Sequence, residues 1–376
     1  MTSDSEIIKS ITKGHSSAES RWARFGPYYA MFPMEFACEV VSIYSKQGDF
    51  VLDPFTGRGS SLFAAAALNR SAFGIEINPV GWLYSNVKLH PALKENVSQR
   101  LSVIVELSDQ YKESVHMMND FFRICFSDKV LMFLLAARDH LEWKRNNVDA
   151  TLMAFILLYL HGKRNQSLSN QMPMTKSTSI NYSLEWWKKK DLRTPPEIDI
   201  EDFFEKRFNW RYGKGIPAFE DATVVPGDST IELRQFRMQQ NPHKKIKLLF
   251  TSPPYYGVTN YFVDQWLRMW VLGGRPEPSI ISDEKYKKRF ASKRDYEELL
   301  DIVFGQCALM MAPNSTVYVR TDVREYTLET TRKVLKKHFT GFDYKEEYNF
   351  CTKKSQTELL RNSLEKPCEV DIIMQR

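Results

Sequence analysis

The sequence has few cysteines and no long hydrophobic run. Its 376 residues include five cysteines, and an odd number without metal-ligand spacing argues against a disulfide framework or a metal site. The longest apolar stretch, near residues 152–160, is far too short to cross a membrane. The first residues, MTSDSEIIKSITKGHSS, lack the apolar core of a signal peptide. These absences predict a reduced, cytoplasmic chain with no metal and no membrane partner.

Composition and charge leave several classes of globular protein open. Hydrophobic residues make up 43% of the chain and charged residues 26%, which is ordinary for a soluble protein. The net charge of +6 is mildly basic, so nucleic-acid binding is permitted without being demonstrated. At this length the chain can form one large domain or two modest ones.

A glycine-rich turn lies in the first part of the chain. We predict a strand, a loop, a helix and a second strand at residues 51–53, 54–60, 62–68 and 72–75. Gly57 and Gly59 let the backbone approach a ligand, and Glu76 stands where nucleotide-binding units place an acid for ribose hydroxyls. The loop lacks the third glycine of a dinucleotide site and the Lys-Ser/Thr of a P-loop. A plain turn, with Asp53 only capping the loop, is the alternative.

The middle of the chain is helical and then strongly polar. Apolar spacing predicts helices over residues 101–121, 129–143 and 148–161. The stretch GKRNQSLSNQMPMTKSTSINYSLEWWKKK follows, dense in Ser, Asn, Gln and Lys with interleaved aromatic residues. Such a mixture suits a surface that contacts base edges and phosphates. A long solvated loop whose tryptophans fill the core is an equally weighted alternative.

The last part of the chain returns to alternating strands and helices. We predict strands near residues 223–225, 247–250, 316–319, 344–350 and 369–374, and helices over 296–312 and 327–338. This alternation indicates a mostly parallel sheet with crossover helices. Ligands of such sheets bind beyond the carboxyl ends of the strands. Asp53, Glu76, Asp228 and Ser252 all fall at such ends, so one pocket is expected to collect them.

Two motifs together resemble those of a known enzyme family. The sequence TSPPY at residues 251–255 is similar to the catalytic motif of amino-methylating nucleic-acid methyltransferases, and DPFTGRG at 53–59 is similar to their S-adenosylmethionine loop. The resemblance covers roughly residues 25–92 and 220–376. It implies an α/β, Rossmann-like seven-stranded sheet with helices on both faces. We therefore expect a catalytic domain made of residues 1–94 and 216–376, with a largely helical insertion at 95–215 as the candidate target-recognition region.

The chemistry of this family agrees with what the motif residues can do. An exocyclic amine is a poor nucleophile because its lone pair is delocalised into the base. Ser252 Oγ and the Pro253 carbonyl could accept the amine hydrogens and free that lone pair, with Pro254 stiffening the corner. Tyr255 offers a face for stacking a base that has been flipped out of the duplex. No cysteine nucleophile is needed.

The resemblance also implies binding roles for other residues. Gly57 and Gly59 would contact the methionine part of the cofactor, Glu76 its ribose, and Asp228 would lie near the adenine. Phe32 has core packing as an equal alternative. The complete set of expected cofactor-binding residues is Phe32, Pro33, Asp53, Phe55, Thr56, Gly57, Gly59, Ser60, Glu76, Ile77, Asp228 and Ser229. The DNA-binding candidates are Lys163, Arg164, Asn165, Gln166, Lys176, Tyr182 and Trp186.

Serine at the head of the motif is typical of cytosine N4 methylation, whereas Asp or Asn is typical of adenine N6. The expected function is a site-specific DNA methyltransferase of a bacterial or phage restriction-modification system, with duplex DNA as substrate and a cognate endonuclease acting separately. We expect a monomer. Alternatives are an adenine-N6 enzyme, an RNA base methyltransferase and an inactive DNA-binding subunit. Many such enzymes place the catalytic motif first, whereas here the cofactor loop precedes it. Residues 260–274 either line the DNA cleft or form an amphipathic helix.

Overall fold

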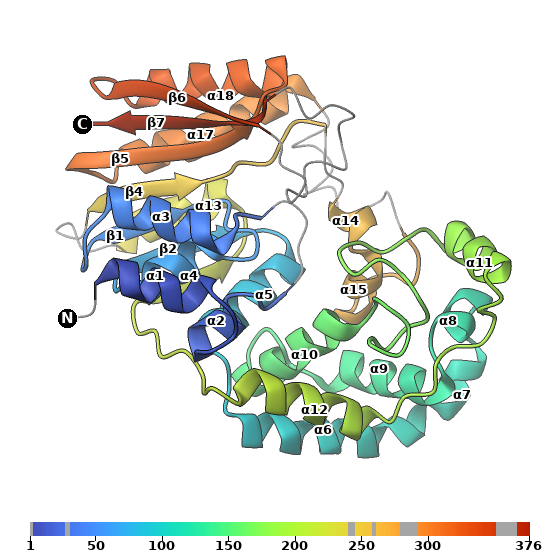
Figure 1. The fold of residues 1–376 in the computed structure, drawn as a ribbon. Helices are drawn as coiled ribbons and strands as arrows, with labels where there is room; N and C mark the ends of the chain where they lie inside the picture. Colours follow the sequence, from blue (N-terminus) through green and yellow to red (C-terminus); the bar gives the residue numbers. More distant parts are fainter. Residues whose placement is uncertain (1–2, 27–30, 240–244, 258–260, 279–291, 351–366) are drawn as a thin grey trace.

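One seven-stranded sheet organises the chain (Figure 1). The structure is a computed structural model that describes residues 3–26, 31–239, 245–257, 261–278, 292–350 and 367–376. The strands run in the order β3-β2-β1-β4-β5-β7-β6. Their bounds are β1 Phe50–Asp53, β2 Ser71–Glu76, β3 Ala222–Pro226, β4 Ile246–Thr251, β5 Met311–Asp322, β6 Asp343–Phe350 and β7 Pro367–Gln375.

The direction of the strands gives the sheet a topological switch point. Strands β1 to β5 pair in parallel, and β7 pairs antiparallel with both β5 and β6. The chain passes outward from β1 to β2 and β3 and then returns to β4 on the other side of β1. In doubly wound sheets, the ligand crevice lies at this reversal, outside the carboxyl ends of the two central strands. The predicted Rossmann-like seven-stranded fold is confirmed.

Two hydrophobic cores cover the two faces of the sheet. Side chains alternate along β1, so Val51 belongs to one core while Phe50 and Leu52 belong to the other. On the first face pack α3 (Met34–Tyr44), α4 (Ser60–Ala67) and α5 (Pro79–Leu89). On the second face pack α13 (Ser229–Gln239), α17 (Lys293–Ala308) and α18 (Glu325–His338).

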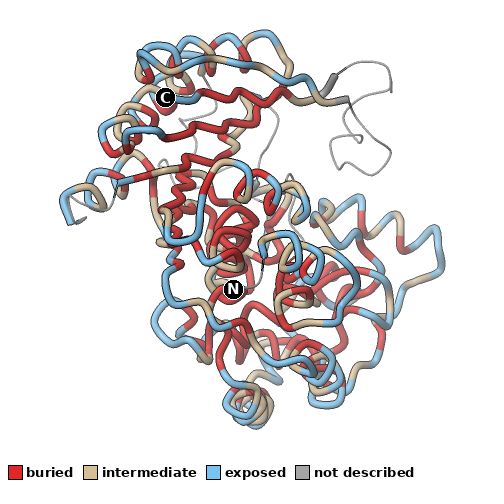
Figure 2. The backbone as a smooth tube through the Cα atoms, turned by 60° about the vertical axis from the view of Figure 1, so that its left-hand side comes forward, coloured by how far each residue is buried: buried red, intermediate tan, exposed pale blue. Residues whose placement is uncertain are grey.

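A helical region is inserted between β2 and β3, as the sequence predicted. It extends the first core without a break, so buried backbone continues from the sheet into the helices (Figure 2). The division into domains at 94/95 and 215/216 therefore stays a prediction. The elements are α6 Lys94–Ser108, η1 Asp109–Tyr111, α7 Lys112–His116, α8 Asp120–Cys125, α9 Asp128–His140, α10 Asn147–Tyr159, α11 Ile180–Lys189 and α12 Ile200–Tyr212.

Two expected helices differ from the structure. The helix expected over 101–121 is broken into α6, η1, α7 and the start of α8, because the Asn119 side chain caps a new helix by accepting from Phe122 N. The helix expected over 296–312 ends at Ala308, and β5 begins at Met311. Pro313 has no N–H to continue a helix, and Asn314 has a left-handed φ of 54°. Within the described residues, no helix has the length and apolar content of a membrane span.

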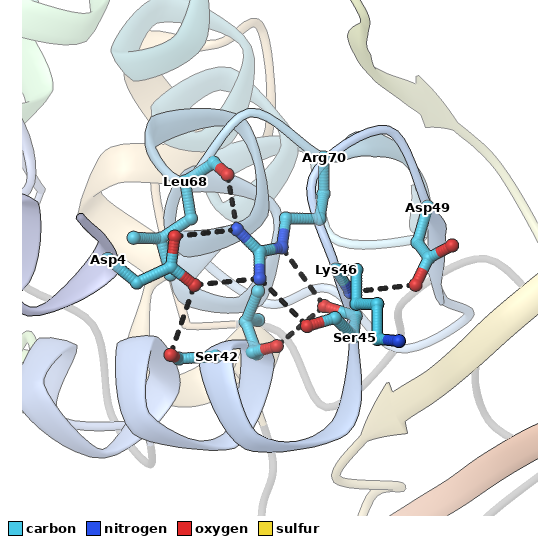
Figure 3. A network of polar contacts seen from close by, with 8 residues as sticks. Asp4, Ser42, Ser45, Lys46, Asp49, Leu68 and Arg70 are labelled. Atoms are coloured by element: carbon cyan, nitrogen blue, oxygen red, sulfur yellow. Dashed lines mark hydrogen bonds and ion pairs between the residues drawn. The ribbon is translucent and has the colours of Figure 1, made fainter. Parts of the chain in front are cut away.

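The N-terminal helix is tied to the amino end of the sheet (Figure 3). Arg70, directly before β2, binds the carboxylate of Asp4 in α1 (Asp4–Thr12) at 2.7 and 3.0 Å. Its guanidinium also donates to the carbonyl of Ser45 at 2.8 Å and to the Ser45 hydroxyl at 3.2 Å. Ser42 Oγ donates to the same Asp4 carboxylate at 3.0 Å. This network closes the edge opposite to the switch point.

Candidate cofactor and catalytic site

A hydrogen bond joins the two central strands at their carboxyl ends. Thr251 Oγ1, the end of β4, donates to Asp53 Oδ1, the end of β1, at 2.6 Å. Both residues are buried. The chain continues from them into Ser252 and Pro54, so the Ser-Pro-Pro-Tyr corner and the glycine loop start side by side. The structure thus brings together the two motifs that the sequence separates by nearly two hundred residues.

Asp53 uses its carboxylate to hold this junction. Its Oδ1 also accepts from Phe55 N at 3.0 Å, and its Oδ2 accepts from the Ser61 hydroxyl. Burial raises the pKa of Asp53 to about 6, although the hydrogen bonds from Ser61, Thr251 and Phe55 oppose that rise. This geometry favours a positioning role, which was the alternative for this residue. A direct contact between Asp53 and a cofactor stays a prediction.

The glycine loop has a backbone that other residues would not adopt readily. Gly57 and Gly59 have φ values of 56° and 75°. A Cβ on Gly59 would also stand 2.8 Å from Ser85 Oγ. Thr56 fixes the start of the loop, because its N–H donates to Ile75 O at 3.1 Å and its hydroxyl donates to the Asp53 carbonyl at 2.9 Å. These two hydrogen bonds hold the start of the loop against the ends of β1 and β2.

Glu76 closes the loop from the end of β2. Its Oε2 accepts from Gly57 N at 2.6 Å and its Oε1 accepts from Asn78 N at 2.7 Å. Burial raises the pKa of Glu76 to about 8, the two backbone hydrogen bonds oppose that rise, and nearby Asp53 adds to it. Ile77, next along the chain, is half-buried. A carboxylate beside an apolar side chain at this edge suits a ribose next to a flat base.

The loop after β3 joins the same edge. Gly227 N donates to the Glu76 carbonyl at 3.1 Å, and the Ser229 hydroxyl donates to the Pro54 carbonyl. Asp228 is buried, and its Oδ1 accepts from Thr230 N and Thr230 Oγ1 at 2.9 and 2.8 Å. The ends of β1, β2 and β3 are therefore linked. The expected place of Asp228 near the adenine stays a prediction.

The catalytic corner lies at the surface of this edge. Pro253 is buried, whereas Ser252, Pro254 and Tyr255 are half-buried. Burial of the Tyr255 hydroxyl and the nearby Glu369 carboxylate raise the pKa of Tyr255, while its hydrogen bond with Ser252 lowers it. Ser252 thus retains some exposed surface, and its side chain hydrogen-bonds with that of Tyr255. Stacking of a base on Tyr255 stays a prediction.

The segment ahead of the glycine loop packs on β4. The ring of Phe32 is stacked on Phe250, with centroids 4.7 Å apart and planes at 8°. Pro33 is exposed and caps α3. Core packing accounts for Phe32. Its stacking partner, Phe250, is also two residues before Ser252 in the sequence. Residues 27–30, which belong to the same predicted segment, lie outside the described residues.

Part of the polar stretch in the middle of the chain is docked against helices that come after the Ser-Pro-Pro-Tyr corner in sequence. It packs along α14 (Tyr261–Asp264) and α15 (Trp266–Val271), which follow that corner in sequence. Ser177 N donates to the Asp264 carbonyl at 2.7 Å. Gln265 and Trp266 donate to the carbonyls of Thr175 and Thr178, both at 3.0 Å. The helix expected over 260–274 is thus two short helices within the described part.

A buried arginine reinforces this docking. Arg268 has no exposed surface. Its guanidinium donates to Leu157 O at 2.9 Å, to Gln265 Oε1 at 2.6 Å and to Met174 O at 2.7 Å. It joins α10, α15 and the polar stretch. No pattern in the sequence indicates that this arginine is buried.

The DNA-binding candidates divide into two groups. Arg164 is half-buried and donates to Asn170 Oδ1 and Thr194 O, both at 2.8 Å. Trp186 is half-buried, and its neighbour Trp187 is buried, with Nε1 donating to Gln171 O at 2.7 Å. The exposed candidates are Lys163, Asn165, Gln166, Lys176 and Tyr182. Burial of Trp187 agrees with the alternative in which tryptophans fill the core, and DNA binding by the exposed residues stays a prediction.

Several residues of the edge were not singled out from the sequence. Ser85 and Lys88 of α5 donate to the glycine loop at 2.9 and 2.6 Å. Asn78 caps α5 and has a buried Nδ2 without a partner. The signal that could have revealed Ser85 and Lys88 is two polar residues three apart on a mostly apolar helix. Among the described residues, no cluster of three His, Cys, Asp or Glu side chains could hold a metal.

Comparison with known proteins matches the part that contains the glycine loop. A family described as DNA methylase (N6_N4_Mtase) matches residues 6–81. The type II methyltransferase M.MthZI of Methanothermobacter thermautotrophicus is 43% identical over 49 residues, 13% of this chain and 14% of that relative. The type II methyltransferase M.MvaI of Kocuria varians is 23% identical over 300 residues, 69% of this chain and 63% of that relative. The chain spans less than two thirds of each relative.

Solved structures give looser matches. TrmN from Thermus thermophilus has a TM-score of 0.34 at 8% identity, covering 95% of this chain and 52% of that one. The rRNA methyltransferase aviRa from Streptomyces viridochromogenes has a TM-score of 0.33 at 9% identity, covering 98% and 92%. These are loose overlaps, and the strand order itself shows the fold. The sequence matches show that the part of the chain with the glycine loop is similar to amino-methylating DNA methyltransferases, without separating the N4 group from the N6 group.

Proposed function

We propose that this protein transfers a methyl group from S-adenosylmethionine to the exocyclic N4 amine of cytosine in duplex DNA. The observation that carries the proposal is the Thr251–Asp53 hydrogen bond, which sets Ser252 beside the glycine loop. A transfer of this kind depends chiefly on placement of donor and acceptor. The shared edge would supply that placement.

S-adenosylmethionine is the methyl donor of this family, and the edge fits it. Glu76 would accept from the ribose hydroxyls, and half-buried Ile77 would face the adenine. The backbone of Gly57 to Gly59 and the start of α4 would hold the methionine part, since a helix N-terminus favours a carboxylate. Ser60 Oγ and Asn78 Nδ2 are buried without partners in the described structure, so donors remain for a ligand. When bound, the cofactor supplies an electrophilic methyl on its sulfonium.

The corner at residues 252–255 would activate the target amine. Ser252 Oγ and the Pro253 carbonyl would accept its two hydrogens and favour a pyramidal nitrogen. The prolines fix φ and remove backbone donors, which keeps acceptors facing the amine. Tyr255 would stack on the base, which must leave the duplex to reach this edge.

Serine at position 252 is the reason for choosing cytosine N4, with adenine N6 as the alternative. The physical difference from the Asp of other motifs is the absence of charge, which suits the more acidic amine of cytosine. Both sequence relatives are named type II methyltransferases, which supports a role in restriction-modification. A separately acting endonuclease and a monomeric enzyme are part of the proposal.

Transfer of labelled methyl groups to DNA tests the reaction. The wild-type protein is expected to label duplex DNA and not total RNA, and digestion of the product is expected to yield N4-methylcytosine. Ser252→Ala should reduce transfer at least about a hundredfold, the size reported for loss of one preorganised polar contact, while S-adenosylhomocysteine binds as before. Label in N6-methyladenine would correct the base. Label in RNA, or full activity of the Ser252 variant, would refute the proposal or its mechanism.

The exposed residues of the docked polar stretch are the proposed DNA contacts. Lys163→Ala and Lys176→Ala should each reduce the slope of log K against log salt by about one, as expected for one lost phosphate contact. Lys336→Ala, on exposed α18 at the other face, is the control and should leave the slope unchanged. If the slopes for Lys163→Ala and Lys176→Ala equal the slope for the Lys336→Ala control, this stretch does not contact DNA.

A further inference from the structure

Helix α5 presents two polar side chains to the underside of the glycine loop. Ser85 and Lys88 are three residues apart, so they share a face of the helix. Ser85 Oγ donates to the Gly57 carbonyl at 2.9 Å, and Lys88 Nζ donates to the Arg58 carbonyl at 2.6 Å. Two successive carbonyls of the loop are therefore held by one helix face.

These carbonyls determine where the neighbouring N–H groups point. In a trans peptide, the C=O and the following N–H point in opposite directions, and no described peptide bond is cis. Since the Gly57 carbonyl points to α5, the Arg58 N–H points away from it. Gly59 N–H donates to the Thr56 carbonyl at 2.9 Å, whereas Arg58 N–H has no acceptor within the described residues. Together with the unpartnered Ser60 hydroxyl, it is a donor left for a ligand.

Lys88 is an unexpected residue for this place. It has no exposed surface, and burial lowers its pKa well below the ordinary value, with Arg58 and Arg211 adding to that effect. The part of the chain that is described offers it a carbonyl and no carboxylate. Burying an amine in this way opposes stability, so the contact with the loop is expected to serve the site instead.

We propose that Ser85 and Lys88 are positioning residues that hold the glycine loop in the orientation that binds the amino-acid portion of the cofactor. Through them, Arg58 N–H and the Ser60 hydroxyl are available to the carboxylate of that portion, at the N-terminus of the eight-residue helix α4. The adenosine portion would be bound elsewhere on the edge, by Glu76 and Ile77, which hydrogen-bond to neither Ser85 nor Lys88. This inference rests on the proposed function and deepens it.

Two ligands separate the effect of the loop from binding in general. S-adenosylhomocysteine carries the amino-acid group, and 5′-methylthioadenosine lacks it. Calorimetric titration of Lys88→Met should show about tenfold weaker binding of S-adenosylhomocysteine, the effect of losing a hydrogen bond that orients the loop, with binding of 5′-methylthioadenosine unchanged. Ser85→Ala should show the same selectivity with a smaller loss. Lys88→Arg keeps a donor and should recover part of the affinity.

The controls distinguish this inference from the proposed function. Lys112→Met, at an exposed position of α7, should bind both ligands like the wild type. Equal weakening of both ligands in the Lys88 and Ser85 variants would mean a general structural role and overturn the inference, as would unchanged affinity for S-adenosylhomocysteine. If Lys88→Met does not fold, Ser85→Ala and Lys88→Arg carry the same comparison. Failure of the wild type to bind S-adenosylhomocysteine would contradict the proposed function itself.

Discussion

Buried cationic side chains have different partners at the amino and carboxyl edges of the parallel strands. At the amino end of β1 and β2, Arg70 binds the Asp4 carboxylate as well as neighbouring carbonyl and hydroxyl oxygens (Figure 3). At the carboxyl end, the buried cations Arg58 and Lys88 donate to the carbonyls of Gly26 and Arg58. In the described structure, neither is paired with a carboxylate. The buried cation at the amino edge thus has a carboxylate partner within the protein, whereas the buried cations at the carboxyl edge have only carbonyl acceptors.

This difference separates stability from function. A buried polar group without a partner destabilises a fold, so such a group beside a candidate ligand site is a candidate contact for the ligand. Ser60 Oγ, Asn78 Nδ2 and Arg58 Nε are buried without partners, and all belong to the segments that follow β1 and β2. The amino edge should therefore respond to mutation in its stability, and the carboxyl edge in its binding.

The largest effect on stability is expected from removing the Arg70–Asp4 ion pair at the amino edge. Asp4→Asn leaves the Arg70 guanidinium buried without its carboxylate, and removal of one partner of a buried pair destabilises strongly. We expect the free energy of unfolding to fall by about 3 kcal/mol, measured by urea denaturation. Binding of S-adenosylhomocysteine should stay unchanged, because the network lies at the opposite edge of the sheet.

An exposed carboxylate on a neighbouring helix supplies the matched control. Glu39→Gln in α3 removes a charge from the surface and should change stability by no more than about 0.5 kcal/mol. If Asp4→Asn behaves like this control, the network contributes little. If it weakens ligand binding as much as it weakens the fold, the two edges are not separate.

The sequence predicted the carboxyl edge better than the contacts within it. The mostly parallel sheet and the grouping of Asp53, Glu76 and Asp228 follow from alternating elements, because parallel strands end at one edge. The bond from Thr251 to Asp53 spans 198 residues, and no local pattern reports such a partner. Arg268 likewise reads as a surface charge, and only tertiary packing shows that it fixes the polar stretch. Apolar spacing alone predicted one helix over 101–121, whereas the Asn119 cap starts a new helix within that range.

A smaller effect is expected at Glu76, and it depends on pH. Burial raises the pKa of Glu76 to about 8, above its ordinary value of 4.5. The folded state therefore holds this proton more tightly than the unfolded state, so the contribution to stability is greatest below pH 4.5 and is lost as the pH rises toward 8. Ribose hydroxyls donating to the carboxylate would favour its ionised form. Ligand binding at pH 7 should then release a proton.

Calorimetry in buffers of different ionisation enthalpy measures that release. The wild type should release up to about one proton per S-adenosylhomocysteine at pH 7 and should bind more tightly as the pH approaches 8. Glu76→Gln should lose the proton release and bind about tenfold more weakly, as expected for loss of a hydrogen bond to a charged group. Heats that do not depend on the buffer in the wild type would show that Glu76 does not contact the ligand.

The same substitution at both edges gives the smallest and most direct comparison. Ser42 Oγ donates to Asp4 at 3.0 Å, so Ser42→Ala should lower the free energy of unfolding by about 1 kcal/mol without affecting ligand binding. Ser60 Oγ has no partner in the described structure, so Ser60→Ala should leave stability unchanged or raise it by a few tenths of a kcal/mol, since alanine also favours the helix. Ser60→Ala should weaken the binding of S-adenosylhomocysteine a few-fold and leave the binding of 5′-methylthioadenosine unchanged. Denaturation and calorimetry on the two variants should therefore give opposite patterns, and matching patterns would show that the unpartnered hydroxyl is not kept for a ligand.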